Sequence, residues 1–177
     1  MHDILARASN FKAWDGVRYA ADLAARLDGA LTGVYVNPSP MYMLPPYGTP
    51  DLLEAMIENA RAVERDAYAS ADAFVAWAKQ VGVRQASWQI AEGHLPDALA
   101  HIGDWHDLLV LERDPDAAWS SPPELGALVL GARLPCIVAP AGQREARLDC
   151  VALAWNGTAE AVRAIHAAAK DKDGALA

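Results

Sequence analysis

The sequence has few of the features that mark secreted, membrane-spanning or disulfide-bonded proteins. It contains two cysteines, Cys136 and Cys150, and each lies in an apolar run of strand type, where a thiol behaves as a small hydrophobic side chain. No apolar stretch reaches the roughly 18 residues that a membrane helix needs. The amino terminus becomes polar at His2-Asp3, where an export signal would continue into an apolar segment. We therefore expect a cytoplasmic protein with no membrane partner and no disulfide.

Positive charge is also scarce. Lys and Arg number 15 against 23 Asp and Glu, which gives a formal net charge of -8. Nucleic-acid binding needs clustered Lys and Arg that release counterions from the phosphate backbone. Here Arg61 and Arg65 stand among Glu58, Glu64 and Asp66. We expect no nucleic-acid partner.

What the sequence does contain is enough apolar material for a packed core. Hydrophobic residues make up 53% of 177 residues, which suits one full domain with a remainder. Strand-like and helical patterns alternate along the chain. Expected strands cover residues 4–8, 31–36, 86–90, 107–111 and 135–139, and expected helices cover residues 15–27, 51–82, 96–102 and 124–133. This alternation predicts an α/β protein of Rossmann-like layout, an open parallel sheet with helices on both faces.

Several helix boundaries carry recognisable signals. Gly29 is expected to stop the first helix. Thr49-Pro50-Asp51 combines a capping hydroxyl, a proline at the first helical position and an acid near the positive end of the dipole. From there, apolar residues at sevenfold spacing predict one long helix that runs to Gly82. The apolar loop 41–47 before it either covers a ligand, contacts a partner or packs over the sheet edge.

The end of the chain echoes its beginning. Residues 149–154 (DCVALA) resemble residues 3–8 (DILARA), and residues 160–163 (EAVR) resemble residues 15–18 (DGVR). The offset of about 146 residues is the length of one α/β unit. We therefore predict a first domain over residues 1–142 and an incomplete second repeat over residues 143–177. Either the chain is part of a longer tandem protein, or the tail packs on the first domain.

Four segments together resemble the universal stress protein family, in its bacterial tandem form. They are residues 92–99 (EGHLPDAL), 107–111 (DLLVL), 130–140 (LGARLPCIVAP) and 151–158 (VALAWNGT). The resemblance implies a five-stranded parallel sheet of the adenine nucleotide alpha hydrolase-like type and a role in stress response without catalysis. It also implies a homodimer, or pairing of tandem units, through the last strand from Pro135 to Pro140. In part of the family, ATP binds at the carboxyl ends of the strands.

Family members that bind ATP carry a G-x2-G-x9-G-[S/T] loop after the fourth strand, as the resemblance implies. Its glycines let backbone amides approach the phosphates. Here Glu112 and Pro115 stand at the two early glycine positions, and Pro122-Pro123 stand at the late pair. Gly126 is the only glycine between Gly103 and Gly131. Carboxylates repel a polyphosphate, and proline has no amide to donate. We therefore predict a degenerate nucleotide crevice and no cofactor in the first unit.

Other positions of the crevice follow from the same resemblance. Ser9 takes the place of an aspartate on the adenosine side, and Val36 matches a valine near the adenine. In the second repeat the corresponding turn is Asn156-Gly157-Thr158. An alternative is therefore that ATP, or more readily adenosine or AMP without the long phosphate tail, occupies the crevice beside Ser9 and Val36.

Two further alternatives have weaker support. His94, Asp97 and His101 are spaced to share one helix and could converge on a metal, although solvated or capping histidines are commoner. A small hydrolase of related fold would need a nucleophile with a histidine–acid relay, and the serines lie in no G-x-S-x-G motif. We predict neither a metal site nor catalytic residues.

Overall fold

The computed structural model describes residues 3–39, 48–115, 117, 120–147 and 157–170. The chain divides into two compact units, Met1–Glu145 and Ala146–Ala177. The predicted boundary between residues 142 and 143 lies close to this division. That the second unit begins another repeat stays a prediction, because residues 148–156 lie outside the described part of the chain.

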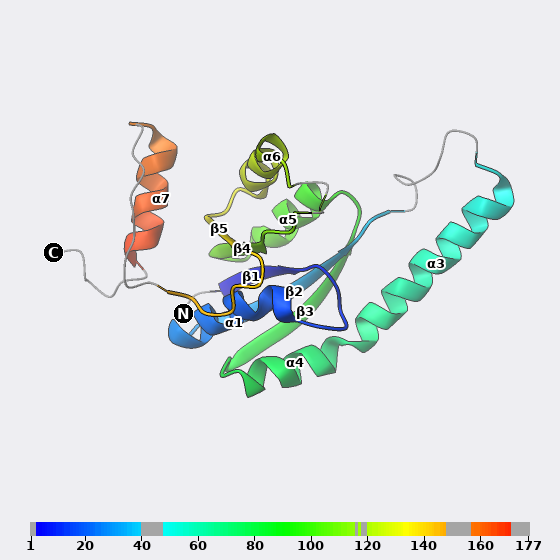
Figure 1. Cartoon of the computed structure of the whole chain (residues 1–177), viewed down its shortest axis with the longest axis horizontal. Coiled ribbons are helices and arrows are strands. Elements are labelled where there is room, and N and C mark those ends of the chain that lie inside the picture. Colours follow the sequence, from blue (N-terminus) through cyan, green and yellow to red (C-terminus); the bar gives the residue numbers. More distant parts are fainter. Residues whose placement is uncertain (1–2, 40–47, 116, 118–119, 148–156, 171–177) are drawn as a thin grey trace. The chain divides into compact units, whose positions relative to one another are not determined.

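The first unit is built on a five-stranded parallel sheet, as the alternation predicted (Figure 1). Its strands stand in the order β3-β2-β1-β4-β5, and every neighbouring pair is parallel. Chain order therefore reverses between β1 and β4, where open α/β sheets bind ligands. The strands are β1 (Asp3–Ala8), β2 (Ala30–Asn37), β3 (Gln85–Glu92), β4 (Leu108–Glu112) and β5 (Cys136–Ala139).

Helices cover the two faces of this sheet. In Figure 1, α5 and α6 lie above the sheet, whereas α1 and α4 lie below it. On the α5 and α6 face, a buried cluster joins the central strands to both helices; its members are Leu5, Val34, Leu99, Leu109, Leu111, Leu128 and Ala132. The described helices of this unit are the 3-10 turn η1 (Asp15–Val17), α1 (Arg18–Arg26), α3 (Pro50–Ala69), α4 (Ala71–Gln80), α5 (Leu95–Gly103) and α6 (Pro122–Ala132).

The opposite face is held by aromatic rings around a glycine. Phe74 of α4 packs against Trp88 of β3 at 4.9 Å between ring centroids and against Trp14 at 5.9 Å. Gly33 of β2 lies beneath these rings, and a β-carbon there would lie 2.5 Å from Phe74 Cζ. The absence of a side chain at Gly33 lets the rings sit directly on the sheet.

The predicted single helix over residues 51–82 is wrong in one respect, because the chain forms two helices that meet at Ser70. Figure 1 shows the change of direction between α3 and α4. The Ser70 hydroxyl donates to the carbonyl of Asp66 at 2.9 Å, a back-bond that competes with the helical ladder and bends helices. The predicted start is confirmed: the Thr49 hydroxyl accepts from the Leu52 amide at 3.4 Å, and Pro50 opens α3.

The first helix also ends differently from the prediction. Asp28, not Gly29, takes the left-handed conformation after α1, with φ of 55°. The Gly29 amide then donates to the carbonyl of Ala24 at 2.8 Å. A short polar residue is among the few that tolerate this backbone region.

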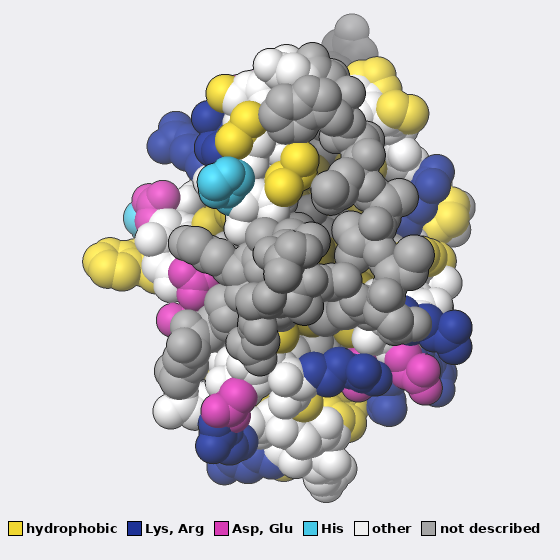
Figure 2. All heavy atoms as spheres, turned by 90° about the vertical axis from the view of Figure 1, so that its left-hand side faces the viewer, with side chains coloured by type: hydrophobic (Ala, Val, Ile, Leu, Met, Phe, Trp, Pro, Cys, Tyr) yellow, Lys and Arg dark blue, Asp and Glu magenta, His cyan; other side chains and the backbone are white. Residues whose placement is uncertain are grey.

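The described part of the second unit holds one helix, α7 (Ala159–Lys170). Thr158 begins it, since the Thr158 hydroxyl accepts from the Ala161 amide at 3.4 Å. None of the helices in the described ranges is both long and apolar enough to cross a bilayer. On the face that Figure 2 shows, Lys and Arg side chains lie in separate groups, and acidic side chains lie among them.

Candidate nucleotide crevice

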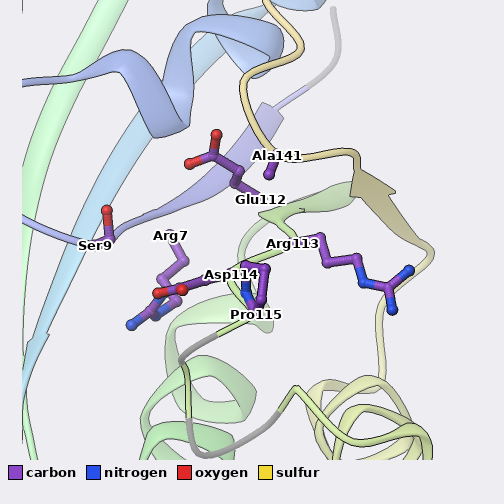
Figure 3. Close-up of a pocket in the computed structure, with 7 residues that line it drawn as sticks. All are labelled: Arg7, Ser9, Glu112, Arg113, Asp114, Pro115 and Ala141. Atoms are coloured by element: carbon purple, nitrogen blue, oxygen red, sulfur yellow. The ribbon is translucent and has the colours of Figure 1, made fainter.

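A small crevice opens at the carboxyl ends of β1 and β4, where the chain order reverses (Figure 3). Its volume is about 160 Å³. Most of its lining residues lie at or near the ends of these strands, because β1 ends at Ala8 and β4 ends at Glu112. The lining residues are Arg7, Ser9, Glu112, Arg113, Asp114, Pro115 and Ala141.

Glu112 sits at the centre of the contacts around this crevice. One carboxylate oxygen, Oε1, accepts from the backbone amide of Gly142 at 2.9 Å. The other, Oε2, lies so close to Gly16 that a β-carbon on Gly16 would clash with it. The side chain thus bridges the turn before α1 and the segment after β5. A backbone amide that would suit a bound anion is already used by a carboxylate of the chain itself.

Arg7 supplies a positive charge to the crevice, and the second arginine of its lining, Arg113, points away from Arg7 in Figure 3. Burial lowers the pKa of its guanidinium, whereas the charges of Asp114, Tyr35 and Glu112 act to raise it. In Figure 3 the Asp114 carboxylate points toward Arg7. The positive charge of Arg7 is therefore already offset by acids at and after the end of β4.

The loop after β4 uses its own amides in turns. The Ala117 amide donates to the Asp114 carbonyl at 3.2 Å, and the Ser120 amide donates to the Ala117 carbonyl at 2.9 Å. Pro115, between them, has no amide hydrogen. The described part of this loop therefore offers few free donors to a ligand.

The start of α6 is equally unsuited to an anion. Its first two residues are Pro122 and Pro123, so two of the amides that a helix start normally exposes are absent. The Ser121 hydroxyl donates to the Glu124 carboxylate at 2.7 Å, which places a negative charge in the first turn. The helix dipole is thus already matched by an acid.

The structure brings together only part of the predicted site. Ser9 and Glu112 line the same crevice, whereas Val36 packs against the hydrophobic cluster beneath α5 and α6. Gly126 lies inside α6, with nothing within 4 Å of a β-carbon built there.

The predicted residues of the second repeat fall outside the first unit. Gly157, with φ of 78°, and Thr158 belong to the second unit, and Asn156 lies outside the described residues.

Sequence reasoning missed two contributors to the crevice. Arg7 interrupts an apolar strand, and a charge in a buried strand is a signal that something must compensate it. Gly142 carried no local signal, because its role depends on a side chain thirty positions earlier along the chain.

Two of the described histidines contact other groups of the chain. His94 Nδ1 lies 3.2 Å from Asp97 Oδ2, and His106 Nδ1 lies 2.9 Å from the carbonyl of Ile102. Across the described ranges, no three His, Cys, Asp or Glu side chains are grouped so that they would hold a metal ion.

Comparison of the structure with solved proteins relates its fold to universal stress proteins. The structure of UspA from Lactobacillus plantarum aligns with a TM-score of 0.58 and 20% identity, covering 78% of this chain and 97% of that one. A universal stress protein family structure from Burkholderia pseudomallei aligns with a TM-score of 0.50 and 22% identity, covering 79% and 96%. The sequence matches no family model and no curated protein. The fold of the first unit is thus that of the universal stress proteins.

Proposed function

We propose that this chain is a universal-stress-protein-type module that acts without catalysing a reaction, and that its first unit has lost ATP binding. The fold and the four segments that resemble the family support the first part. The observation that carries the second part is the Glu112 carboxylate, which accepts from the Gly142 amide at the switch point of the sheet.

Three physical effects act in the same direction. The carboxylates of Glu112 and Asp114 repel an incoming polyphosphate. Each also attracts the Arg7 guanidinium electrostatically, which leaves less of its positive charge for a ligand. The first turn of α6 lacks two amides and carries Glu124. The crevice volume of about 160 Å³ is well below the roughly 300–1,000 Å³ typical of ligand pockets.

Titration calorimetry with magnesium ATP tests this proposal on the full chain. We expect no measurable binding to the wild type. The double variant Glu112→Ala with Asp114→Ala, which removes both acids near Arg7, is expected to gain weak binding. A control variant with the same charge change at exposed sites, Asp72→Ala with Asp104→Ala, is expected to show no binding. A micromolar affinity of the wild type that Arg7→Ala weakens would overturn the proposal.

An adenosine or AMP site is the second candidate, and it is favoured by one observation. Ser9 lines the crevice, so a hydroxyl is available to a ribose or a small phosphate. Thermal denaturation with and without AMP tests it: a rise in midpoint that Ser9→Ala abolishes supports this candidate, and an unchanged midpoint removes it.

For partners, we propose pairing through the last strand, either with a second copy or with a second repeat. β5 stands at the end of the sheet order, so its outer edge has no strand beside it among the described residues. The carbonyl of Pro135 accepts from Leu109 of β4, and that of Ala139 accepts from Arg113, the residue after β4. Val138 between them therefore directs its amide outward. Val138→Pro, which removes that amide, is expected to abolish the pairing in sedimentation velocity. An unchanged mass would contradict it.

A further inference from the structure

The outer face of α3 carries four charged side chains that pair with nothing in the described part of the chain. The inner side of the helix is tied to the sheet: the Asn37 side chain donates to the Ala60 carbonyl at 3.2 Å, and the Trp88 indole donates to the Ala67 carbonyl at 2.9 Å. Figure 1 shows the amino-terminal half of α3 extending away from the sheet. Its outer side presents the exposed residues Glu54, Glu58, Arg61 and Arg65.

These four residues form one stripe along the helix. Their spacing of four, three and four places them on the same face. They also line a shallow groove of about 490 Å³ together with the partly exposed Ile57. Within the described part of the chain, none of these four side chains has a hydrogen bond or ion pair.

The stripe contains two like-charged pairs that are unfavourable in a single helix, although its central pair, Glu58 and Arg61, is of opposite sign. Glu54 and Glu58 are like charges four positions apart, and so are Arg61 and Arg65. Like charges at this spacing destabilise a helix. A partner that places opposite charges beside both like-charged pairs relieves this repulsion.

The symmetry of the stripe identifies that partner. α3 runs from Pro50 to Ala69, so its midpoint lies between Asn59 and Ala60. Glu54 and Arg65 are equally distant from this midpoint, and the same holds for Glu58 and Arg61. An antiparallel copy of α3 related by a two-fold axis at the midpoint therefore sets each acid opposite a base. A C2 contact of this kind uses the same patch on both copies.

We propose that α3 pairs antiparallel with α3 of a second copy of this chain, through Glu54 opposite Arg65 and Glu58 opposite Arg61 on both sides of the axis. The contact goes beyond the proposed function and does not depend on the state of the crevice. Because exposed ion pairs contribute little each, the association is weak and salt-dependent. We expect the dissociation constant to rise by about tenfold or more between low and high salt, as screening shortens the range of the charges.

Sedimentation velocity of the full chain with charge-reversal variants tests the pairing. Glu54→Arg with Glu58→Arg makes the stripe entirely basic, and Arg61→Glu with Arg65→Glu makes it entirely acidic. Each variant alone is expected to have half the low-salt mass of the wild type. Mixing the two restores the larger mass, because each stripe then meets its opposite. The quadruple variant with all four reversals also restores it, since the inverted order remains self-complementary.

A matched control reverses two acids away from α3, Asp72→Arg with Asp104→Arg, and keeps the wild-type mass. Circular dichroism confirms that each variant is folded. The proposal is overturned if the double variants keep the wild-type mass, if the quadruple variant stays at half that mass, or if salt leaves the mass of the wild type unchanged. A contact through β5 would survive every reversal on α3, so the two interfaces are distinguished.

Discussion

At the scale of the residue, Glu112 shows how one side chain can change the use of a site. Its carboxylate accepts a hydrogen bond from the Gly142 amide and lies against Gly16. Both contacts are at the sheet edge where open α/β folds bind ligands. A glycine there would leave both groups open. The chemistry of the crevice is thus decided by one acid and the two backbone positions that it contacts.

Gly33 and Gly126 make a matched pair of predictions at this scale. At Gly33 a β-carbon would meet Phe74 at 2.5 Å and Trp88 at 2.8 Å, so Gly33→Ala is expected to cost about 1–3 kcal/mol of unfolding free energy through overpacking. Gly126 lies in α6 with open space around it, so Gly126→Ala is expected to stabilise by roughly 0.5–1 kcal/mol through helix propensity. Urea unfolding measures both, and equal effects of the two changes would contradict the packing argument.

Cys136 provides a pH-dependent prediction. Burial raises the pKa of its thiol to about 12, from an ordinary value of 9.0. Below pH 9 the thiol keeps its proton in both states, and its contribution to stability is complete. As pH rises from 9 toward 12, only the unfolded chain loses the proton, so stability is lost.

The measurement compares urea unfolding of the wild type and Cys136→Ala at two pH values, which cancels the effect of every other titrating group. The advantage of the wild type is expected to be roughly 1 kcal/mol smaller at pH 10 than at pH 8. An advantage that is the same at both values would show that the folded thiol ionises as readily as the unfolded one.

At the scale of the element, α3 and α4 illustrate how local chemistry divides a continuous apolar pattern. The sevenfold repeat of apolar residues passes through Ser70 without interruption, yet the Ser70 hydroxyl bonds back to Asp66 and the helix changes direction there. The repeat alone therefore predicts where a helix is buried, and not whether it stays straight.

The start of α3 gives the prediction for this scale. The Thr49 hydroxyl caps the Leu52 amide, so Thr49→Ala is expected to cost about 1 kcal/mol of unfolding free energy. Thr49→Ser keeps the hydroxyl and should restore most of that loss. Thermal or urea unfolding distinguishes them, and an alanine variant as stable as the wild type would show that Pro50 alone sets the start of the helix.

At the scale of the whole molecule, the five strands and both helical layers of the sheet lie within the unit Met1–Glu145. A chain that ends at Glu145 is therefore expected to fold cooperatively with the helix and strand content of this unit. Circular dichroism with urea unfolding checks this. A truncated chain that lacks a cooperative transition would show that the sheet needs residues beyond Glu145.

Much of the fold follows from local patterns. The alternation of apolar strands with amphipathic helices predicted all five strands, because a buried parallel strand such as Leu108–Glu112 is continuously apolar. The family resemblance, and not a local pattern, suggested Ser9 and Glu112 for the crevice, and both line it in the structure. The side on which Val36 lies could not be predicted from the sequence, since a residue near the end of a β-strand can face either the crevice or the core.

The sequence by itself determined the class of fold and the composition of the loop after β4, because hydrophobic periodicity and proline content act over a few residues. Only the tertiary structure decided which groups occupy the crevice. The Gly142 amide donates to the Glu112 carboxylate, and the Arg7 guanidinium is attracted by Glu112 and Asp114. These groups are too far apart in the chain for a local pattern to pair them. Likewise, the charges of α3 were visible as letters, but their exposure along one face, symmetric about the midpoint of the helix, depends on how α3 lies on the sheet.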